Sequence, residues 1–224
     1  MKTTITQYYD QLAPNYDSNR FGNSYGRFLH QQEEAILEHR LKPVNNLPVL
    51  DLGCGTGRFL KFATHGLDAS TGMLEVAKQK FPDKTLQLGS AFTMPFESRS
   101  FGAVFSFHLL MHLSAPDLQA LLAEAHRVLQ PGGRFIFDFP SKSRRSLIGY
   151  RAANWHGANA YAMAEVTAAA EGQWKLEAAS GILFFPLHRF PGFIRPWLMP
   201  IDTWLCRTFL KRYASYIVVI LLKT

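Results

Sequence analysis

The hydrophobic pattern along the chain alternates between apolar runs of strand length and longer segments with helical spacing. Residues 5–41 have a helical period, with apolar side chains recurring on one face, and Pro43 ends that pattern. Shorter apolar runs are predicted as strands at 47–52, at a brief segment ending in Asp68, and at 85–88, 101–107, 134–139, 174–179 and 216–222. This alternation favours an α/β sheet with helical crossovers.

Caps and helix breakers mark two of the crossover helices. Ser70 is a typical N-cap residue, and Pro82 closes the helix that it begins. The segment Ser114–Asp117 resembles a capping box, so we expect a helix that continues to Leu129. Pro131-Gly132-Gly133 then stops the helix before the next strand.

The last third of the chain has a different character. A helix is predicted at 161–171, and the segment Gly181–Tyr213 is rich in Pro and aromatic residues, so we expect it to form a lid. Within it, one helical face carries Ile201, Trp204, Leu205 and Phe209. Ordinary packing of this helix is the favoured interpretation. In one alternative, the apolar lid binds a hydrophobic small molecule. In the other, the helix contacts a lipid surface, with Arg207 and Lys211 on its polar side.

Length and composition bound the class of protein. At 224 residues and 47% apolar side chains, the chain is expected to form one domain, with a cap at 1–46, a core at 47–140 and a substrate-side region at 141–224. We expect a soluble cytoplasmic protein, because no signal-like or membrane-spanning apolar run occurs. Cys54 and Cys206 lie far apart in sequence, so neither a disulfide framework nor a metal site is predicted.

The net charge of +7 invites a nucleic-acid interpretation, but charge alone is weak support for it. The densest basic cluster is opposed in the sequence only by Asp138, and a solvated face is its favoured interpretation. Attraction of an acidic substrate or of a membrane surface are the alternatives. The cluster consists of Arg134, Lys142, Arg144, Arg145 and Arg151.

A glycine-rich turn follows the first predicted strand. Gly53, Gly55 and Gly57 at alternate positions let the backbone approach a ligand closely. A dinucleotide-binding turn would have glycine or alanine where this chain has Arg58, which argues against NAD. Asp68 ends the next strand, where a carboxylate can accept hydrogen bonds from the ribose hydroxyls of an adenosine ligand.

At this point the sequence resembles a known family. The segments Val49–Phe59 and Gly66–Leu74 look like the first two motifs of class I S-adenosylmethionine-dependent methyltransferases. Gly89–Phe96, Ser100–Val104 and His126–Gly133 resemble later blocks of the small-molecule branch, of the type 11/25 kind, in the expected order. The opening segment Tyr9–Asp17 is similar to the N-terminal helix of that family, and the resemblance covers about residues 7–140.

The resemblance implies a fold and an activity. The fold is a Rossmann-like sheet of seven mostly parallel strands with helices on both faces, an antiparallel last strand, an N-terminal helical cap and a C-terminal lid insertion. The implied activity is methyl transfer from S-adenosylmethionine to a small organic acceptor on oxygen, nitrogen or carbon. A catalytically silent protein that binds the same cofactor, and an RNA methyltransferase, are the alternatives. No DNA partner is expected.

The resemblance also implies cofactor contacts. The methionine end is assigned to Asp51, Gly53, Cys54, Gly55 and Gly57, the ribose to Asp68, the adenine to Ala69, Met73, Ser90, Ala91 and Phe92, and further cofactor contacts to Phe107 and to Tyr16 with Tyr9 or Tyr25 as helper. Cys54 is expected to be a small residue of the turn and not a nucleophile. Departures from the family pattern are Ser90 and Gly102, where Asp is frequent, and a short crossover between Gly57 and Asp68.

A proton acceptor is needed only for some acceptor atoms. The candidates at carboxyl ends of strands are His112 first, then His108 and Asp138. For both histidines a structural or cofactor-contacting role is the alternative. His156 and His188 carry less weight, and Ser106–Leu109 lacks the Pro-Pro-aromatic motif typical of enzymes that methylate exocyclic base nitrogens.

Overall fold

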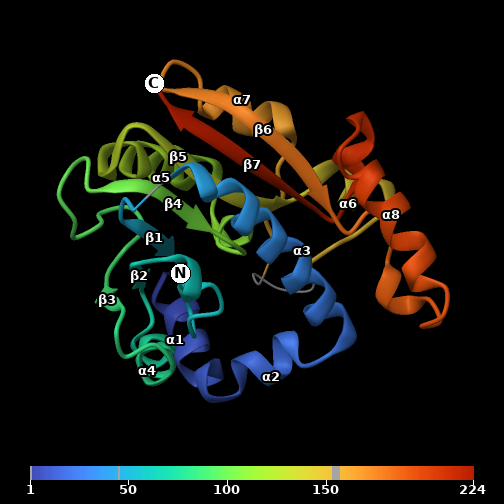
Figure 1. Cartoon of the computed structure of the whole chain (residues 1–224), viewed down its shortest axis with the longest axis horizontal. Coiled ribbons are helices and arrows are strands. Elements are labelled where there is room, and N and C mark those ends of the chain that lie inside the picture. The colour runs from blue at the N-terminus through green and yellow to red at the C-terminus, as the bar shows by residue number, and fades with distance from the viewer. Residues whose placement is uncertain (1, 45, 153–156) are drawn as a thin grey trace.

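The strands of the computed structural model lie in one seven-stranded sheet, which crosses the centre of the molecule in Figure 1. The structure describes residues 2–44, 46–152 and 157–224. The strands are β1 Val49–Leu52, β2 His65–Asp68, β3 Thr85–Leu88, β4 Phe101–Ser106, β5 Leu129–Pro140, β6 Trp174–Ile182 and β7 Tyr216–Lys223. Their order across the sheet is β3-β2-β1-β4-β5-β7-β6.

The direction of each strand follows from its neighbours. Strands β1 to β5 pair in parallel, whereas β7 lies between β5 and β6 and is antiparallel to both. Every residue of β1 and β4 is buried, which explains why these strands do not alternate with polar residues and are apolar apart from Asp51 and Ser106. The mostly parallel sheet with an antiparallel last strand is therefore confirmed.

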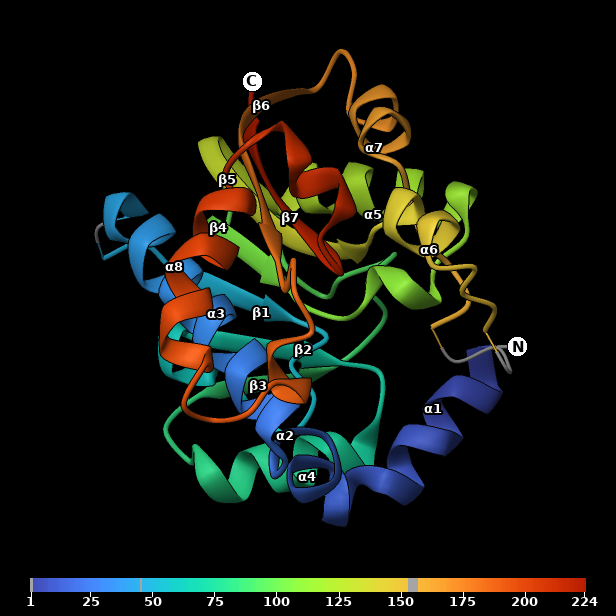
Figure 2. The same ribbon diagram turned by 90° about the vertical axis from the view of Figure 1, so that its right-hand side faces the viewer.

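Helices cover both faces of this sheet, as Figure 2 shows. On one face, α5 (Ala115–Val128) and α7 (Met163–Ala169) pack with the large side chains of β5. On the other face, α3 (Ser24–Arg40) and α4 (Thr71–Lys80) contribute Leu29, Leu37 and Ala77 to a second core cluster. The predicted two-sided α/β architecture is thus confirmed.

The N-terminal cap predicted as helical over 5–41 is helical, and it is divided into several elements. The segment consists of α1 (Lys2–Leu12), a 3₁₀ turn that contains Pro14, α2 (Tyr16–Phe21) and α3. The Asn23 side chain caps α3 by accepting a hydrogen bond from the Gly26 amide. The helical prediction is confirmed, and the breaks fall where Pro14 and the Asn23 cap each start a new element.

The caps predicted for the crossover helices are present. Ser70 Oγ accepts a hydrogen bond from the Met73 amide at the start of α4, and Ser114 and Asp117 form the reciprocal capping box of α5. Helix α5 ends at Val128, but β5 already begins at Leu129 and includes the Pro-Gly-Gly segment. The strand is therefore longer than predicted.

The basic cluster lies partly on a short helix, α6 (Lys142–Leu147). Arg134 pairs with Glu177 at 2.8 Å, and Lys142 pairs with Glu165 at 2.5 Å. Asp138 is buried in β5 and pairs elsewhere, so the interpretation that it opposes this cluster is wrong.

Helix α8 (Arg195–Leu205) does not pack as predicted. Of the four residues assigned to its buried face, only Leu205 is buried, and Ile201, Trp204 and Phe209 are exposed. The helix turns its polar Asp202 inward, which reverses the predicted orientation. Among the described residues, the helices are too short or too polar to cross a bilayer.

Candidate functional site

The glycine turn between β1 and the following 3₁₀ turn depends on backbone conformation. Gly53, Gly55 and Gly57 have φ values of +72°, +54° and +87°, a region that side chains with a Cβ adopt at a cost. A Cβ on Gly57 would also lie 2.9 Å from Leu60, whereas one on Gly53 would meet only ordinary contacts. The first two glycines are therefore required by conformation, and the third also by packing.

The amides of this turn bond within the protein. Those of Gly53 and Cys54 donate to the carbonyl of Leu67 at 2.7 and 3.0 Å, and that of Gly55 donates to Asp68 Oδ2 at 2.8 Å. The turn consequently ties the end of β1 to the end of β2. What it offers a ligand is a backbone surface without side chains.

Asp68 organises the end of β2. Its Oδ1 accepts a hydrogen bond from the Ser70 amide at 2.9 Å while Oδ2 accepts the one from Gly55. Burial raises the pKa of Asp68, the backbone hydrogen bonds oppose that shift, and nearby Asp10 adds to it. A carboxylate has about four acceptor positions, so these two bonds leave capacity for a ligand.

The N-terminal helix is anchored to the same corner. Asp10 Oδ1 in α1 accepts hydrogen bonds from Ser70 Oγ at 2.5 Å and from the Gly72 amide at 3.0 Å. A Cβ on Gly72 would lie 3.0 Å from the Asp10 carbonyl, so glycine permits this close approach. Helix α1 is thereby held against the start of α4.

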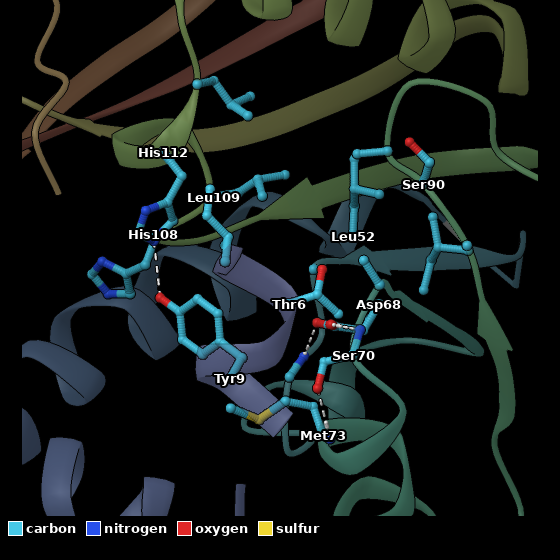
Figure 3. Close-up of a pocket in the computed structure, with 18 of the residues that line it drawn as sticks. Thr6, Tyr9, Leu52, Asp68, Ser70, Met73, Ser90, His108, Leu109 and His112 are labelled. Atoms are coloured by element: carbon cyan, nitrogen blue, oxygen red, sulfur yellow. Dashed lines mark hydrogen bonds between the residues drawn. The ribbon is translucent and has the colours of Figure 1, made fainter. Parts of the chain in front are cut away.

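A cavity of about 400 Å³ opens beside the turn, at the carboxyl ends of β1, β2 and β4. Its position is the one where open α/β sheets bind ligands. Figure 3 shows its wall, with Asp68 and Ser70 on one side and His112 and Tyr9 on the other. The predicted site residues that line it are Tyr16, Gly53, Gly55, Asp68, Ala69, Met73, Ser90, Ala91, Phe92, Phe107, His108 and His112.

Four predicted residues do not line this cavity: Asp51, Cys54, Gly57 and Asp138. Asp51 is buried in β1, and burial raises its pKa to about 8 although Arg58 counteracts the shift. The buried Cys54 thiol lies where a Cβ on Gly66 would meet it at 2.9 Å, and burial raises its pKa well above the usual value. A neutral, enclosed thiol supports the interpretation of Cys54 as a packing residue of the turn.

Two aromatic residues from the N-terminal helices complete the wall. The Tyr9 hydroxyl lies 2.9 Å from His112 Nε2, as the dashed line in Figure 3 marks, and the Tyr9 and Tyr16 rings meet edge to face at 6.1 Å. Burial raises the pKa of Tyr9 well above its usual value, so its hydroxyl stays protonated and can donate to the imidazole. Tyr25 does not line the cavity and lies instead against His188 at 4.7 Å.

A buried ionic network lies behind the cavity. His108 has φ +62°, its Nε2 lies 2.8 Å from Glu33 Oε1, its Nδ1 lies 3.4 Å from Asp138 Oδ2, and its amide donates to Asp138. Arg58, stacked between the rings of Phe21 and Phe59, contacts the second oxygen of Glu33 at 2.5 Å. Two cations and two carboxylates thus neutralise each other.

The protonation of this network follows from its contacts. Burial lowers the pKa of His108, but Glu33 and Asp138 outweigh burial and the net shift is upward. For Glu33, burial raises the pKa, yet Arg58 and His108 dominate and lower it. Burial raises the pKa of Asp138 to about 6, against the opposing effect of His108. These directions favour the imidazolium form of His108, which has no free lone pair to act as a base.

Glu33, His108 and Asp138 each offer a ligand atom within 4.8 Å of the others, a spacing that metal sites also use. Arg58 already occupies one oxygen of Glu33, and the imidazolium balances the rest. We therefore assign these residues to an ion-pair network. Among the remaining histidines, His188 lies outside the cavity wall, and His156 falls outside the described residues.

Glu33 is the main site residue that the sequence interpretation missed. It lies four residues after Leu29 and four before Leu37, so it occupies the buried face of α3. A lone carboxylate on an apolar helical face is the signal that could have identified it, because a buried charge needs a partner. The partner Arg58 directly follows the glycine turn.

The sequence matches a known domain family. Residues 50–137 match the model described as methyltransferase domain. The chain is 38% identical over 138 residues to an uncharacterized protein of Methanocaldococcus jannaschii, and 31% identical over 147 residues to a demethylmenaquinone methyltransferase of Symbiobacterium thermophilum. These alignments cover 61% and 59% of this chain and 51% and 57% of the relatives, so the chain spans little more than half the length of those relatives.

Solved structures share the fold over nearly the whole chain. A magnesium protoporphyrin IX methyltransferase from Synechocystis aligns with a TM-score of 0.70, 15% identity and full coverage of both chains. A possible histamine N-methyltransferase from Thermotoga maritima aligns with a TM-score of 0.69 and 16% identity, covering 98% of this chain and 100% of that one. With its glycine turn and strand order, the chain shares the fold of these S-adenosylmethionine-dependent methyltransferases, and its residues 50–137 match the methyltransferase domain family.

Proposed function

We propose that this chain transfers a methyl group from S-adenosylmethionine to a small, largely apolar organic acceptor. The observation that carries the proposal is the cavity at the carboxyl ends of β1, β2 and β4, whose wall joins the glycine turn and Asp68 to the Tyr9–His112 pair. S-adenosylmethionine is the methyl donor of this family, and when bound it supplies an activated sulfonium methyl group.

The residues on one side of the cavity suit this cofactor. Gly53 and Gly55 present backbone without side chains, and Asp68 keeps acceptor capacity for ribose hydroxyls. Met73 and Ala91 provide apolar surface for a flat ring, and the Ser90 hydroxyl, which accepts from the Phe92 amide at 3.2 Å, lies on the same wall. We assign these residues to the cofactor, with Tyr16 over its methionine end.

Asp51, Cys54 and Gly57 act on the cofactor through the turn in this proposal. Each lies beneath or beside Gly53 and Gly55, and none lines the cavity. They hold the turn in its positive-φ conformation, so the binding surface is already formed before the ligand binds. Ala69 and Phe107 line the wall and complete the contact surface.

The other side of the cavity suits an apolar acceptor. Ile5, Leu109 and Leu113 line it, so a polar acceptor would lose hydrogen bonds to water there without replacement. Relatives named as demethylmenaquinone methyltransferase and sterol 24-C-methyltransferase support an apolar acceptor. The enclosed geometry favours in-line transfer, because the wall excludes water and limits the orientations of the acceptor.

The Tyr9–His112 pair is the proposed proton acceptor. The Tyr9 hydroxyl lies 2.9 Å from His112 Nε2, so a proton can pass between the two side chains. As the acceptor atom is methylated, its proton passes to the Tyr9 oxygen while the Tyr9 proton passes to His112. His108 and Asp138 serve as positioning residues, because their polar atoms pair with each other and with Glu33.

Calorimetric titration with S-adenosylmethionine tests the cofactor assignment. We expect Asp68→Asn to weaken binding by about 1–3 kcal/mol, because the ribose hydroxyls lose an ionised acceptor. Asp83→Asn is the matched control, because Asp83 is exposed and distant from the wall. Unchanged affinity in Asp68→Asn would remove this residue from the ribose role, provided that circular dichroism shows both variants folded.

Turnover separates an enzyme from a silent binding protein. The protein is incubated with methyl-labelled S-adenosylmethionine and an organic extract of apolar metabolites, and S-adenosylhomocysteine and labelled products are quantified. Binding without turnover on any extract fraction would favour the silent alternative. Label appearing in added RNA in place of the extract would favour an RNA methyltransferase.

A further inference from the structure

Helix α8 presents large apolar side chains to solvent. Trp197 is 80% exposed and Trp204 is 64% exposed, although both belong to the most apolar side-chain types. Further exposed apolar side chains in and beside this helix are Phe193, Met199, Ile201 and Phe209. Trp197, Ile201 and Trp204 share one helical face, and so many exposed apolar side chains on one short segment indicate an interaction surface.

The orientation of α8 is fixed by buried hydrogen bonds. Asp202 points inward and is fully buried, and its Oδ1 accepts a hydrogen bond from the Phe185 amide at 2.7 Å. Its Oδ2 accepts one from Gln32 of α3 at 3.2 Å, while Leu205 packs beside it. Rotating the helix to bury the tryptophans would expose Leu205 and break these bonds, so the outward apolar face is part of the fold.

The same segment carries positive charge. Between Leu187 and Tyr213, Asp202 is the sole acidic residue in the sequence, and its burial removes it from the surface. The basic residues of this stretch are Arg189, Arg195, Arg207, Lys211 and Arg212. Exposed aromatic side chains bordered by cations match the interface of an anionic bilayer, where aromatic rings lie among headgroups and cations meet lipid phosphates.

The position of α8 leaves the cavity open. The cavity wall comes from residues between Ile5 and Asp117, and none of them belongs to α8. Figure 1 places α8 at the margin of the fold, beyond α3, and Figure 2 shows it in front of α3. A surface that covers α8 would therefore not fill the cavity.

We propose that α8 and its flanking turns, residues 187–213, dock this protein on the surface of an anionic lipid bilayer. Helix α8 spans 11 residues, which is too short to cross a membrane, so we place it in the interface plane with its tryptophans at the level of the headgroups. A second copy of the chain is a poorer occupant, because pairing this face with itself would bring its cations together. The inference does not depend on methyl transfer.

Vesicle binding tests this inference on the intact chain. The protein is sedimented with phosphatidylcholine vesicles and with vesicles that contain phosphatidylglycerol, at low and high salt, and tryptophan fluorescence is recorded. We expect binding only to the anionic vesicles, a blue shift of the fluorescence on binding, and release as salt screens the cations. Binding of equal strength to both vesicle types, or to neither, would overturn the proposal.

Two pairs of variants divide the surface into its apolar and charged parts. Trp197→Ser with Trp204→Ser should weaken vesicle binding about tenfold or more, since two aromatic anchors are lost. Arg189→Gln with Arg207→Gln should weaken it about 30-fold, at roughly fivefold for each charge. The matched controls are Leu147→Ser for apolar exposure and Lys42→Gln with Lys175→Gln for charge, and we expect them to bind as the parent does.

The controls for folding use the separate cavity. S-adenosylmethionine affinity and thermal unfolding should be unchanged in all these variants, because α8 contributes nothing to the cavity wall. Analytical ultracentrifugation of the parent in the absence of lipid tests whether a second copy of the chain covers this surface. A dimer that the two tryptophan replacements dissociate would assign the face to a second copy and overturn bilayer docking.

Discussion

The phenolic oxygen of Tyr9 lies 2.9 Å from Nε2 of His112, although 103 positions separate the two residues in the chain. Tyr9 belongs to α1 and His112 to the 3₁₀ turn after β4, so one hydrogen bond joins the N-terminal cap to the core. Asp10, the next residue, fastens the same helix to the start of α4. The cap is consequently part of the site and not merely a cover on it.

Removing either member of the Tyr9–His112 pair should slow methyl transfer. If the pair accepts the proton of the methyl acceptor, Tyr9→Phe and His112→Asn each lower kcat by roughly 10²–10⁴-fold. The double variant should be little slower than either single variant, because residues that act as a unit are not additive. Single-turnover kinetics with saturating labelled cofactor measures the effect.

The control for this prediction is Tyr8→Phe. Tyr8 is the neighbouring tyrosine and accepts a hydrogen bond from Arg20 at 3.1 Å, but it does not line the cavity. Its replacement should leave kcat within about twofold of the parent value. Additive losses in the Tyr9 and His112 variants would contradict a proton relay through both.

The Glu33 network should dominate the stability of the cap. Glu33→Gln leaves the buried Arg58 and His108 charges without their shared partner, so we expect a loss of about 3–5 kcal/mol in the free energy of unfolding. Chemical denaturation at neutral pH measures this loss.

The adjacent residue provides the comparison. Glu34 pairs with Lys61 at the surface, and Glu34→Gln should cost no more than about 1 kcal/mol. If both variants lost the same small amount, the buried network would carry no more stability than a surface pair. Glu33 does not line the cavity and touches its wall only through His108. The free energy of S-adenosylmethionine binding should therefore change less in Glu33→Gln than the free energy of unfolding.

Much of the fold could be predicted because its signals are local. The apolar runs of β1 and β4 and the caps at Ser70 and Ser114 specify their elements within a few residues. The glycine turn is equally local, since three positive-φ positions in five residues leave few alternatives to glycine. Asp68 could be predicted beside the turn because β2, which it ends, follows that turn and pairs with β1.

The features that could not be predicted depend on contacts between distant segments. Glu33 meets Arg58 and His108 only once α3 is packed on the sheet, and no pattern in its own segment identifies the partners. The outward tryptophans of α8 have the same origin, because helical spacing reports an apolar face but not which side the Asp202 hydrogen bonds turn inward. The lid role of Gly181–Tyr213 and the domain boundaries stay predictions.

Gly57 and Gly132 should separate crowding from backbone strain. Both have positive φ, but a Cβ on Gly57 would lie 2.9 Å from Leu60 and 3.1 Å from Phe81, whereas a Cβ on Gly132 would meet no neighbour within 4 Å. Gly132→Ala should therefore cost about 1–2 kcal/mol from conformation alone. Gly57→Ala should cost about 1–3 kcal/mol more, because the packed side chains must also shift.

Equilibrium unfolding of the two glycine variants measures the difference, and cofactor titration adds a second reading. Gly57→Ala should also weaken S-adenosylmethionine binding because it displaces the turn, whereas Gly132→Ala should leave it unchanged. Equal losses of stability in both variants would show that the contacts of Gly57 relax at no cost.

Asp51 should make the stability of the protein fall as pH rises. Burial raises its pKa from an ordinary value of 3.8 to about 8, so the folded state holds a proton that the unfolded state releases. The stabilisation is complete below about pH 4 and is lost as pH rises towards 8, because the folded state binds more protons across that window.

In Asp51→Asn this dependence is absent, so the variant should gain stability relative to the parent between pH 5 and pH 8, by an amount that levels off above about pH 8. Urea unfolding of the parent and of Asp51→Asn at a series of pH values measures the difference. A parallel curve for Asp51→Asn would mean that the buried carboxyl keeps its ordinary pKa in the folded protein.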